Sequence, residues 1–367
     1  MTSSTRALRI YAGLKARQSI ERRGLQPDMV RAIPAAAGGP KGLILGPLDR
    51  FIFGQWLQAS AQPVDLIGAS IGAWRMATAC LDAPVEAFER LERDYIAQRF
   101  DPPEGQRRTP SSLVSERFAQ SLQDFYGGRV GEVLANPRYR LHVIAARGRG
   151  LLSRASPWRT PLGYAAAFAG NALHRSALGC LLERVIFSSS ASDAVHALPF
   201  GVEDIRSAQT RLTESNFMDA LRASCSIPFV LDAVQDISDA PKGAYWDGGI
   251  TDYHMHLDYL ASRNGDGVVL YPHFQKAVIP GWLDKGLKWR HGPSSYLDSM
   301  IVLAPDPAWV ACLPNAKLPD RHDFLSYGTD HDARAKAWNA AAAASRQLAD
   351  EFAQWLHAPD PGRVEAL

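Results

Sequence analysis

An α/β fold, arranged as a three-layer α/β/α sandwich, is predicted by two features of the sequence. Short apolar segments with the length of buried strands alternate with longer segments in which apolar residues recur at helical spacing. Glycine-rich turns at 38–42 and 68–72 join an expected strand to an expected helix. The length of 367 residues fits one large domain or two ordinary ones, and the hydrophobic content of 46% is typical of a globular protein.

The N-terminal residues 1–28 are expected to form a helical segment that docks on the rest of the protein, because Leu8, Tyr11 and Leu14 fall at helical spacing. A main domain is expected over 29–275. Its expected strands are 29–37, 64–67, 139–146, 184–189 and 267–274, and its expected helices are 43–56, 71–81, 84–100, 111–126, 161–182 and 217–230.

Residues 276–367 are expected to form a mainly irregular or helical extension that packs on the same domain. The segment 305–323 is rich in proline, which predicts an irregular path, whereas 332–356 has the pattern of a long helix. No internal repeat and no long linker separates this extension from the main domain.

Composition excludes several classes of protein. The 40 basic and 38 acidic residues give a net charge of +2, so overall charge provides no drive toward nucleic acid. The four cysteines lack the CxxC spacing of zinc sites and the density of a disulfide framework, which predicts thiols in a reducing compartment. The sequence contains no apolar run of about 18 residues, the length that a membrane-spanning helix needs. We therefore expect a cytoplasmic protein with no membrane span and no zinc site, and we expect no cofactor.

The segment 64–74 predicts a nucleophile elbow centred on Ser70. A short apolar strand runs into the pattern Gly-x-Ser-x-Gly and then into a helix, which holds the serine hydroxyl exposed on a sharp turn. Gly68 and Gly72 keep side chains away from the place where the strand and the helix crowd each other. The alternative is a tight strand–helix turn in which Ser70 caps the helix.

Two further glycine motifs flank the elbow in the chain. Gly38, Gly39, Pro40, Lys41 and Gly42 lie where an expected strand enters a helix, and free backbone N–H groups at such a place bind an oxyanion or a phosphate. The spacing differs from the nucleotide-binding patterns GxxxxGK[ST] and GxGxxG. A tight strand–helix turn without a ligand is the simpler alternative.

The third motif, Asp247-Gly248-Gly249, is a tight loop that can direct a carboxylate at a neighbouring group. The alternative is an ordinary Asp-Gly turn.

The three motifs in this order resemble the patatin-like phospholipases, whose pattern is G-G-x-[R/K]-G, then G-x-S-x-G, then D-G-[G/A]. The resemblance covers roughly 29–255, and 223–229 is also similar to an Ala-Ser-x-x-x-Pro segment of that family. It implies a patatin-like catalytic domain over 29–275 and a lipid or phospholipid ester as the substrate. It also implies a Ser–Asp dyad that cleaves the ester through an acyl-enzyme, with no metal.

Carried over onto this sequence, the family pattern makes Ser70 the nucleophile and Asp247 the base. Gly38 and Gly39 become oxyanion-hole donors with Lys41 beside them, and the remaining motif glycines are Gly42, Gly68, Gly72, Gly248 and Gly249. Because a carboxylate that contacts a serine is a weak base in water, the site must raise its pKa by desolvation.

The sequence departs from the family pattern in three places. Pro40 has no N–H, so the oxyanion donors must come from its neighbours. The Asn and Pro that often follow the Asp motif are replaced by 250–255, Ile-Thr-Asp-Tyr-His-Met, which alters the expected groove. Residues 276–367 match no known pattern and could cover the groove as a lid.

The sequence leaves three alternatives to a dyad hydrolase open. A Ser–His–Asp hydrolase would need a histidine after the acid, and His254, His256, His273, His291, His322 and His331 are available. The fold could instead be a catalytically silent lipid-binding or regulatory module. A Ser–Asp enzyme could also pass the acyl group to an acceptor other than water.

Peripheral membrane contact is suggested by two segments. The region 138–159 is rich in arginine, and 279–290 combines Trp282 and Trp289 with nearby lysines, as interfacial helices do. A basic surface that faces only water, and tryptophans that pack in the core, would explain the same residues more simply.

Overall fold

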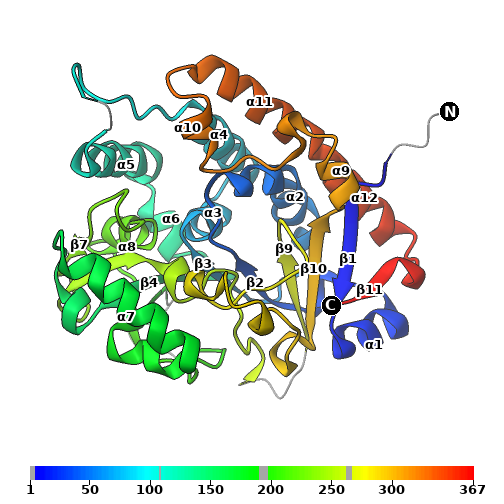
Figure 1. The fold of residues 1–367 in the computed structure, drawn as a ribbon. Helices are drawn as coiled ribbons and strands as arrows, with labels where there is room; N and C mark the ends of the chain where they lie inside the picture. Colours follow the sequence, from blue (N-terminus) through cyan, green and yellow to red (C-terminus); the bar gives the residue numbers. More distant parts are fainter. Residues whose placement is uncertain (1–4, 107–108, 190–196, 262–266) are drawn as a thin grey trace.

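The computed structural model describes residues 5–106, 109–189, 197–261 and 267–367. A mixed sheet flanked by helices forms the centre of the fold, with the strand order β11-β1-β10-β9-β2-β3-β4-β5-β6 (Figure 1). The α/β fold predicted from the sequence is therefore confirmed. The strands are β1 (Leu8–Ala12), β2 (Val30–Ala35), β3 (Val64–Ala69), β4 (Tyr139–Gly148), β5 (Leu182–Ser188), β6 (Ser207–Arg211), β7 (Val234–Gln235), β8 (Ala244–Asp247), β9 (Val268–Pro272), β10 (Met300–Pro305) and β11 (Val364–Ala366).

Helices cover the sheet and its edges. They are α1 (Leu14–Arg23), α2 (Gly46–Phe51), α3 (Ile71–Ala79), α4 (Pro84–Ala97), α5 (Ser111–Tyr126), α6 (Val130–Leu134), α7 (Arg159–Leu173), α8 (Phe217–Ser224), α9 (Pro307–Val310), α10 (Asp323–Ser326), α11 (His331–Ala344) and α12 (Arg346–His357). No helix in the described part of the chain is long and apolar enough to cross a membrane.

The strands β10, β9, β2, β3 and β4 run parallel and form the buried middle of the sheet. Ala35 at the end of β2 pairs with Gly68 near the end of β3, so the loops that leave these two strands emerge side by side. β8 pairs antiparallel with β4 and places Asp247 opposite Ala145. The three sequence motifs therefore converge at the carboxyl ends of parallel strands, the usual place for a site in an open α/β sheet.

The N-terminal segment differs from its prediction. Residues 8–12 form β1, which pairs with β10 and β11, and the helix begins only at Leu14. The expectation that Leu8 and Tyr11 share a helix face with Leu14 is therefore wrong. Isolated apolar residues in a short segment satisfy a strand as well as a helix, and pairing with the distant β10 decides between them.

The C-terminal residues contribute strands as well as helices. β10 and β11 join the main sheet, and β11 lies beside β1, so the first and last strands of the chain are neighbours at one edge (Figure 1). The helix expected over 332–356 is two helices, α11 and α12, that meet at Ser345. The segment 279–290 contains two short 3₁₀ helices, Trp282–Asp284 and Lys288–Arg290, instead of one interfacial helix.

Candidate active site

Ser70 stands on the sharp turn that the sequence predicts. It joins β3 to α3 with φ 56° and ψ −131°, a backbone conformation that costs energy for any residue except glycine. A Cβ atom on Gly72 would lie 2.0 Å from the carbonyl oxygen of Ala35. The helix can approach the strand this closely only because position 72 has no side chain.

Asp247 contacts Ser70 directly. The Ser70 hydroxyl donates a hydrogen bond of 2.8 Å to Asp247 Oδ2, and Gly249 N–H donates one of 2.7 Å to Oδ1. The backbone N–H of Asp247 donates to the carbonyl of Ser226 at 2.9 Å. Both oxygens of the carboxylate are therefore held, one of them by the serine.

Burial changes the acidity of this carboxyl group. Asp247 is 7% exposed and Ser70 is 6% exposed. Desolvation raises the pKa of Asp247 from 3.8 to about 6, even though the hydrogen bonds from Ser70 and Gly249 favour the charged form. At neutral pH the group is therefore mostly ionised, and it is a stronger base than an exposed aspartate.

Ser224 fixes the elbow from behind. Its hydroxyl accepts a hydrogen bond of 2.9 Å from the backbone N–H of Ser70 and donates one of 2.6 Å to the carbonyl of Ile144. The sequence singled out the segment 223–229 without giving this serine a role. The position is fully buried at the end of α8, so only tertiary structure could reveal its two partners.

Gly38 and Gly39 lie beside Ser70 in the same pocket. Gly39 has φ 57°, which suits a glycine, and it begins a 3₁₀ helix, Gly39–Leu45. Among the described residues, the backbone N–H groups of Gly38 and Gly39 have no protein acceptor, whereas the N–H of Lys41 lies inside the 3₁₀ helix, in position to bond to the carbonyl of Gly38. The N–H groups of Gly38 and Gly39 are therefore available to a ligand.

The Lys41 side chain points elsewhere. Its Nζ lies 5.0 Å from the centre of the Phe274 ring, and the residue does not line the pocket that contains Ser70. Partial burial, followed by repulsion from Lys285, lowers the pKa of Lys41. The Lys41 side chain therefore lies over Phe274 and is not part of the pocket wall around Ser70.

The pocket encloses about 400 Å³, including its open mouth. Residues on its walls that the sequence did not single out for the site include Tyr253, Trp282 and Arg321. Arg321 also favours the charged form of Asp247 through its positive charge. Trp282 and Arg321 belong to the C-terminal extension, and no local signal in that irregular stretch connects them with motifs more than thirty residues upstream.

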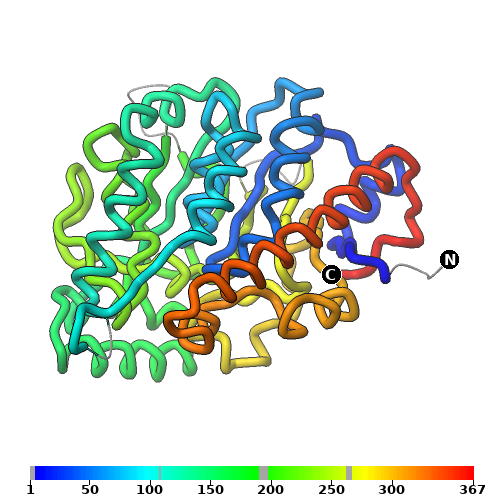
Figure 2. Tube along the Cα trace, turned by 90° about the horizontal axis from the view of Figure 1, so that it is seen from above, coloured from blue at the N-terminus to red at the C-terminus, as the bar shows by residue number. Residues whose placement is uncertain are grey.

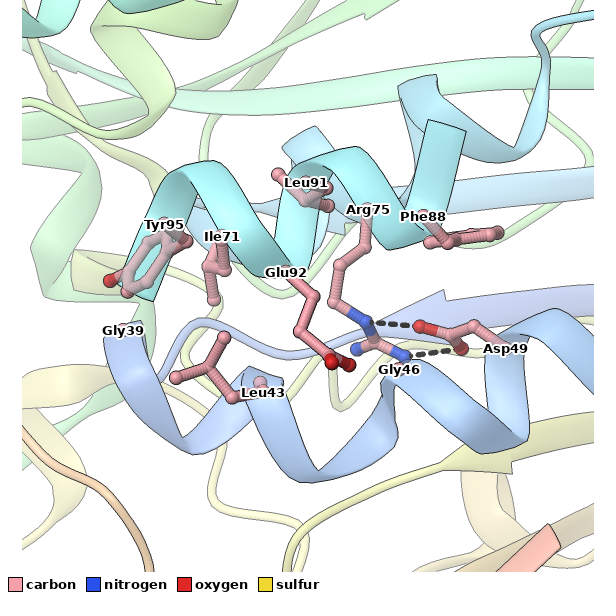
Figure 3. Close-up of a pocket in the computed structure, with 11 residues that line it drawn as sticks. Gly39, Leu43, Gly46, Asp49, Ile71, Arg75, Phe88, Leu91, Glu92 and Tyr95 are labelled. Carbon is pink, nitrogen blue, oxygen red and sulfur yellow. Dashed lines mark hydrogen bonds and ion pairs between the residues drawn. The ribbon is translucent and has the colours of Figure 1, made fainter. Parts of the chain in front are cut away.

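A second cavity, which measures about 330 Å³ when its open side is included, shares Gly39 with the candidate site (Figure 3). Its walls are mainly apolar and come from the 3₁₀ helix Gly39–Leu45 and from α2, α3 and α4. Figure 3 shows Leu43, Ile71 and Tyr95 near Gly39, and the Arg75–Asp49 ion pair at the opposite end with both of its bonds at 2.7 Å.

Among the described residues, no hydrogen bond joins any of the histidines offered by the sequence to Ser70 Oγ or to the Asp247 carboxylate. His254 is buried with its Nδ1 3.0 Å from the carbonyl of Ala277, and burial lowers its pKa to about 3. His256 contacts Ser294, His291 contacts the carbonyl of Asp284, and His331 contacts Asp101. His273 is buried with both ring nitrogens unpaired among the described residues, and the backbone N–H of His322 bonds to Asp320. In this structure the Ser70 hydroxyl donates its hydrogen bond to the carboxylate of Asp247.

No group of three or more His, Cys, Asp or Glu side chains in the described ranges is arranged to hold a metal ion.

Comparison with known proteins agrees with the geometry. The family model for the patatin-like phospholipase matches residues 37–254, which span all three motifs and more than half of the chain. Neither the curated proteins nor the solved structures contain a significant match to this sequence. The matched segment begins at the glycine turn before Ser70 and ends just after Asp247. The chain therefore belongs to the patatin-like phospholipase family.

Proposed function

We propose that this protein is a serine lipid acyl hydrolase that cleaves carboxylic esters, such as those of phospholipids, with Ser70 and Asp247 as its catalytic pair. The observation that carries the proposal is the 2.8 Å hydrogen bond between the Ser70 hydroxyl and Asp247 Oδ2 at the base of an open pocket. Membership of the family gives lipid acyl hydrolysis as the general activity.

The chemistry follows from that contact. Asp247 accepts the hydroxyl proton of Ser70 while Oγ attacks the ester carbonyl, and the proton then passes to the leaving alcohol. Water next attacks the acyl-enzyme, with Asp247 again accepting a proton, and Ser70 is regenerated. A pKa of about 6 for Asp247 supports this role, because the group is ionised at neutral pH and still holds a proton better than an exposed carboxylate.

Stabilisation of the oxyanion is assigned to the glycine turn. The unpaired N–H groups of Gly38 and Gly39 line the pocket beside Ser70. Lys41, which the sequence places beside them, has its N–H inside the 3₁₀ helix Gly39–Leu45 and is not assigned as a donor. Preorganised N–H donors of this kind contribute about 3 kcal/mol each to lowering the barrier in other acyl-transfer enzymes. The ammonium group of Lys41 has no part in this assignment.

The apolar cavity in Figure 3 is assigned to the acyl chain, because it adjoins Gly39 and has walls of Leu43, Ile71 and Leu91. Leu43→Trp should fill part of this space. The expected result is a shift of preference toward shorter acyl chains, measured as kcat/KM across a series of p-nitrophenyl esters. An unchanged chain-length profile would remove the cavity from the proposal.

The decisive experiment compares hydrolysis of a medium-chain p-nitrophenyl ester by wild type, Ser70→Ala and Asp247→Ala. Both variants should lose activity while keeping their circular dichroism spectra. Ser226→Ala is a matched control, because it removes a nearby buried hydroxyl that bonds only to the carbonyl of Arg222. If Asp247→Ala kept near-native activity, the dyad would be wrong.

The alternatives predict different results. A Ser–His–Asp enzyme requires that replacing one histidine abolish activity as Ser70→Ala does, so each of the six candidates is replaced in turn. A silent module would leave Ser70 unlabelled by a fluorophosphonate. A transacylase would transfer the acyl group to an added alcohol faster than to water, which product analysis separates from hydrolysis.

We also infer that the enzyme works in the cytoplasm and meets its substrate by peripheral contact with membranes. The cytoplasmic location is supported by four free cysteines, of which Cys80 and Cys225 are buried. Fractionation of cells that express the tagged protein tests both statements, since they require recovery in the cytosol and in a salt-extractable membrane fraction.

A further inference from the structure

Large apolar side chains that are exposed to solvent gather in a small part of this protein. Ten of the eleven such residues in the described part of the chain lie in α7 and its N-terminal cap, the turn after α8, the segment 282–296 and α10. These ten are Trp158, Leu162, Phe168, Leu173, Phe229, Val230, Trp282, Trp289, Tyr296 and Leu325. Exposed apolar residues scattered singly need no explanation, but a group of this size indicates a surface that binds something.

These segments share one side of the molecule. In Figure 2, α7 (green), the segment around 280–296 (yellow) and the neighbourhood of α10 (orange) all lie along the lower edge, which is the front of Figure 1. The ring of Tyr164 in α7 lies 6.1 Å from the ring of Phe229. Pro228 and Trp282 line the pocket that contains Ser70. Two of the segments that carry exposed apolar residues, the turn after α8 and 282–296, therefore reach the pocket that contains Ser70, and α7 packs against the first of them.

We define the docking face as the segments 150–173, 225–231 and 280–296. Asp284 is the one acidic residue in these three segments, and it is fully buried. The basic residues there are Arg154, Arg159, Lys285, Lys288 and Arg290. Asp284 is ion-paired with Arg290, so the positive charge among the apolar side chains of the docking face comes from Arg154, Arg159, Lys285 and Lys288.

Buried polar contacts hold the docking face in place. Asp284 accepts hydrogen bonds from Asn171 of α7 at 2.8 Å, from Arg175 at 3.0 Å and from Arg290 at 2.9 Å. These contacts tie the end of α7 to the segment 282–290. The Phe229 side chain is 64% exposed. Its backbone has φ 67°, a conformation that non-glycine residues rarely adopt. The exposed rings are thus presented by a fixed scaffold.

We propose that the docking face inserts its aromatic and aliphatic side chains into the interface of an anionic lipid bilayer and so places the pocket mouth against the membrane. This inference rests on the proposed function for its purpose, since an ester in the bilayer could then enter the pocket without crossing water. Tryptophan, leucine and phenylalanine mixed with lysine and arginine is the composition of interfacial membrane-binding surfaces. A protein partner on this face would close the pocket mouth and block the substrate.

The test measures vesicle binding apart from catalysis. The Ser70→Ala protein, which cannot hydrolyse the lipid, is sedimented with phosphatidylcholine vesicles that contain about 30% phosphatidylglycerol or none. Trp289→Ser and Leu162→Ser, made in that background, should each weaken partitioning about tenfold, because each removes a large side chain from the membrane interior. Leu14→Ser is the matched control, since Leu14 is 54% exposed but lies outside the docking face.

The charge component has its own variant. Lys288→Glu should weaken binding to the anionic vesicles several-fold and leave the weaker binding to neutral vesicles unchanged. Raising the salt concentration should reproduce this loss in the parent protein.

Two results would overturn the proposal. One is partitioning that is equal in the Trp289→Ser, Leu162→Ser and Leu14→Ser proteins. The other is a lipid-free dimer that Trp289→Ser converts to a monomer, which would assign the face to a second copy of the chain. Failure of the proposed function is recognised separately, because wild type would then fail to hydrolyse a water-dissolved short-chain ester whether or not the Ser70→Ala protein binds vesicles.

Discussion

The acidity of Asp247 leads to a quantitative prediction for the pH dependence of the enzyme. Burial raises its pKa from 3.8 to about 6, and only the ionised form can accept the Ser70 proton. With that value the ionised fraction falls from about nine-tenths at pH 7 to about one-tenth at pH 5. We therefore expect kcat/KM for a neutral ester to be about tenfold lower at pH 5 than at pH 7, with half of its maximum near pH 6.

The assay uses a p-nitrophenyl ester followed at the isosbestic wavelength of the product, so that ionisation of nitrophenol does not distort the rates. Circular dichroism at each pH confirms that the protein stays folded. A carboxylate with an ordinary pKa of 3.8 would be largely ionised at both pH values and would give a nearly flat profile. A flat profile between pH 5 and pH 7 would refute the account of Asp247 as a desolvated base.

The same shift predicts how stability depends on pH. Because the folded protein holds this proton more tightly than the unfolded chain, Asp247 lowers the free energy of unfolding as pH rises from about 4 to about 6. The pKa of Asp247 is 3.8 without the protein environment and about 6 in the folded protein. Above pH 6 this difference lowers the free energy of unfolding by about 3 kcal/mol. Asp247→Asn should therefore raise the midpoint of urea unfolding at pH 8 and change it little at pH 4. If Asp247→Asn shifted the urea midpoint equally at both pH values, burial of the Asp247 charge would not be what destabilises the protein.

Three substitutions test the support of the elbow. Ser224→Ala removes the acceptor of the buried Ser70 N–H and one donor to the Ile144 carbonyl, and we expect kcat about tenfold lower with an intact fold. An unchanged kcat would show that the elbow keeps its conformation without Ser224. Gly72→Ala puts a methyl group 2.0 Å from the Ala35 carbonyl oxygen. It should lower the free energy of unfolding, measured by urea titration, by about 3 kcal/mol or more. A loss below about 1 kcal/mol would contradict that clash. Arg75→Met leaves Asp49 charged and unpaired in the core, which should lower the free energy of unfolding by about 3–5 kcal/mol. Adding Asp49→Asn should recover part of this loss. If the losses of the two single variants simply add in the double variant, the two residues are not coupled.

Local sequence patterns were enough to predict the structure where function or burial fixes the spacing of particular residues along the chain. The elbow around Ser70 could be predicted because a strand that turns at once into a helix needs glycine on both sides of the serine. The helix over 111–126 was predicted with its observed bounds, since its apolar residues repeat at helical spacing between a proline and a glycine. In both cases the residues that decide the structure are neighbours in the sequence.

Long-range pairing explains what local patterns missed. β1 is a strand because β10 and β11 provide its hydrogen-bond partners, and both of these come from the far end of the chain. The break at Ser345 between α11 and α12 also escaped detection, because no glycine or proline marks it within an otherwise continuous helical pattern. Ser224 and Arg321 are polar residues whose roles depend on partners that the sequence does not place beside them.

The C-terminal residues matter to the site although the family model ends at residue 254. Trp282 and Arg321 supply part of the pocket wall, and β10 completes the sheet that carries β9 and β2. Ser70, Asp247 and the glycine turn are thus held by the matched segment, whereas Trp282 and Arg321 on one side of the pocket come from the extension. If membrane docking occurs through Trp289 and its neighbours, the extension sets how a lipid reaches a reaction centre that the rest of the chain assembles.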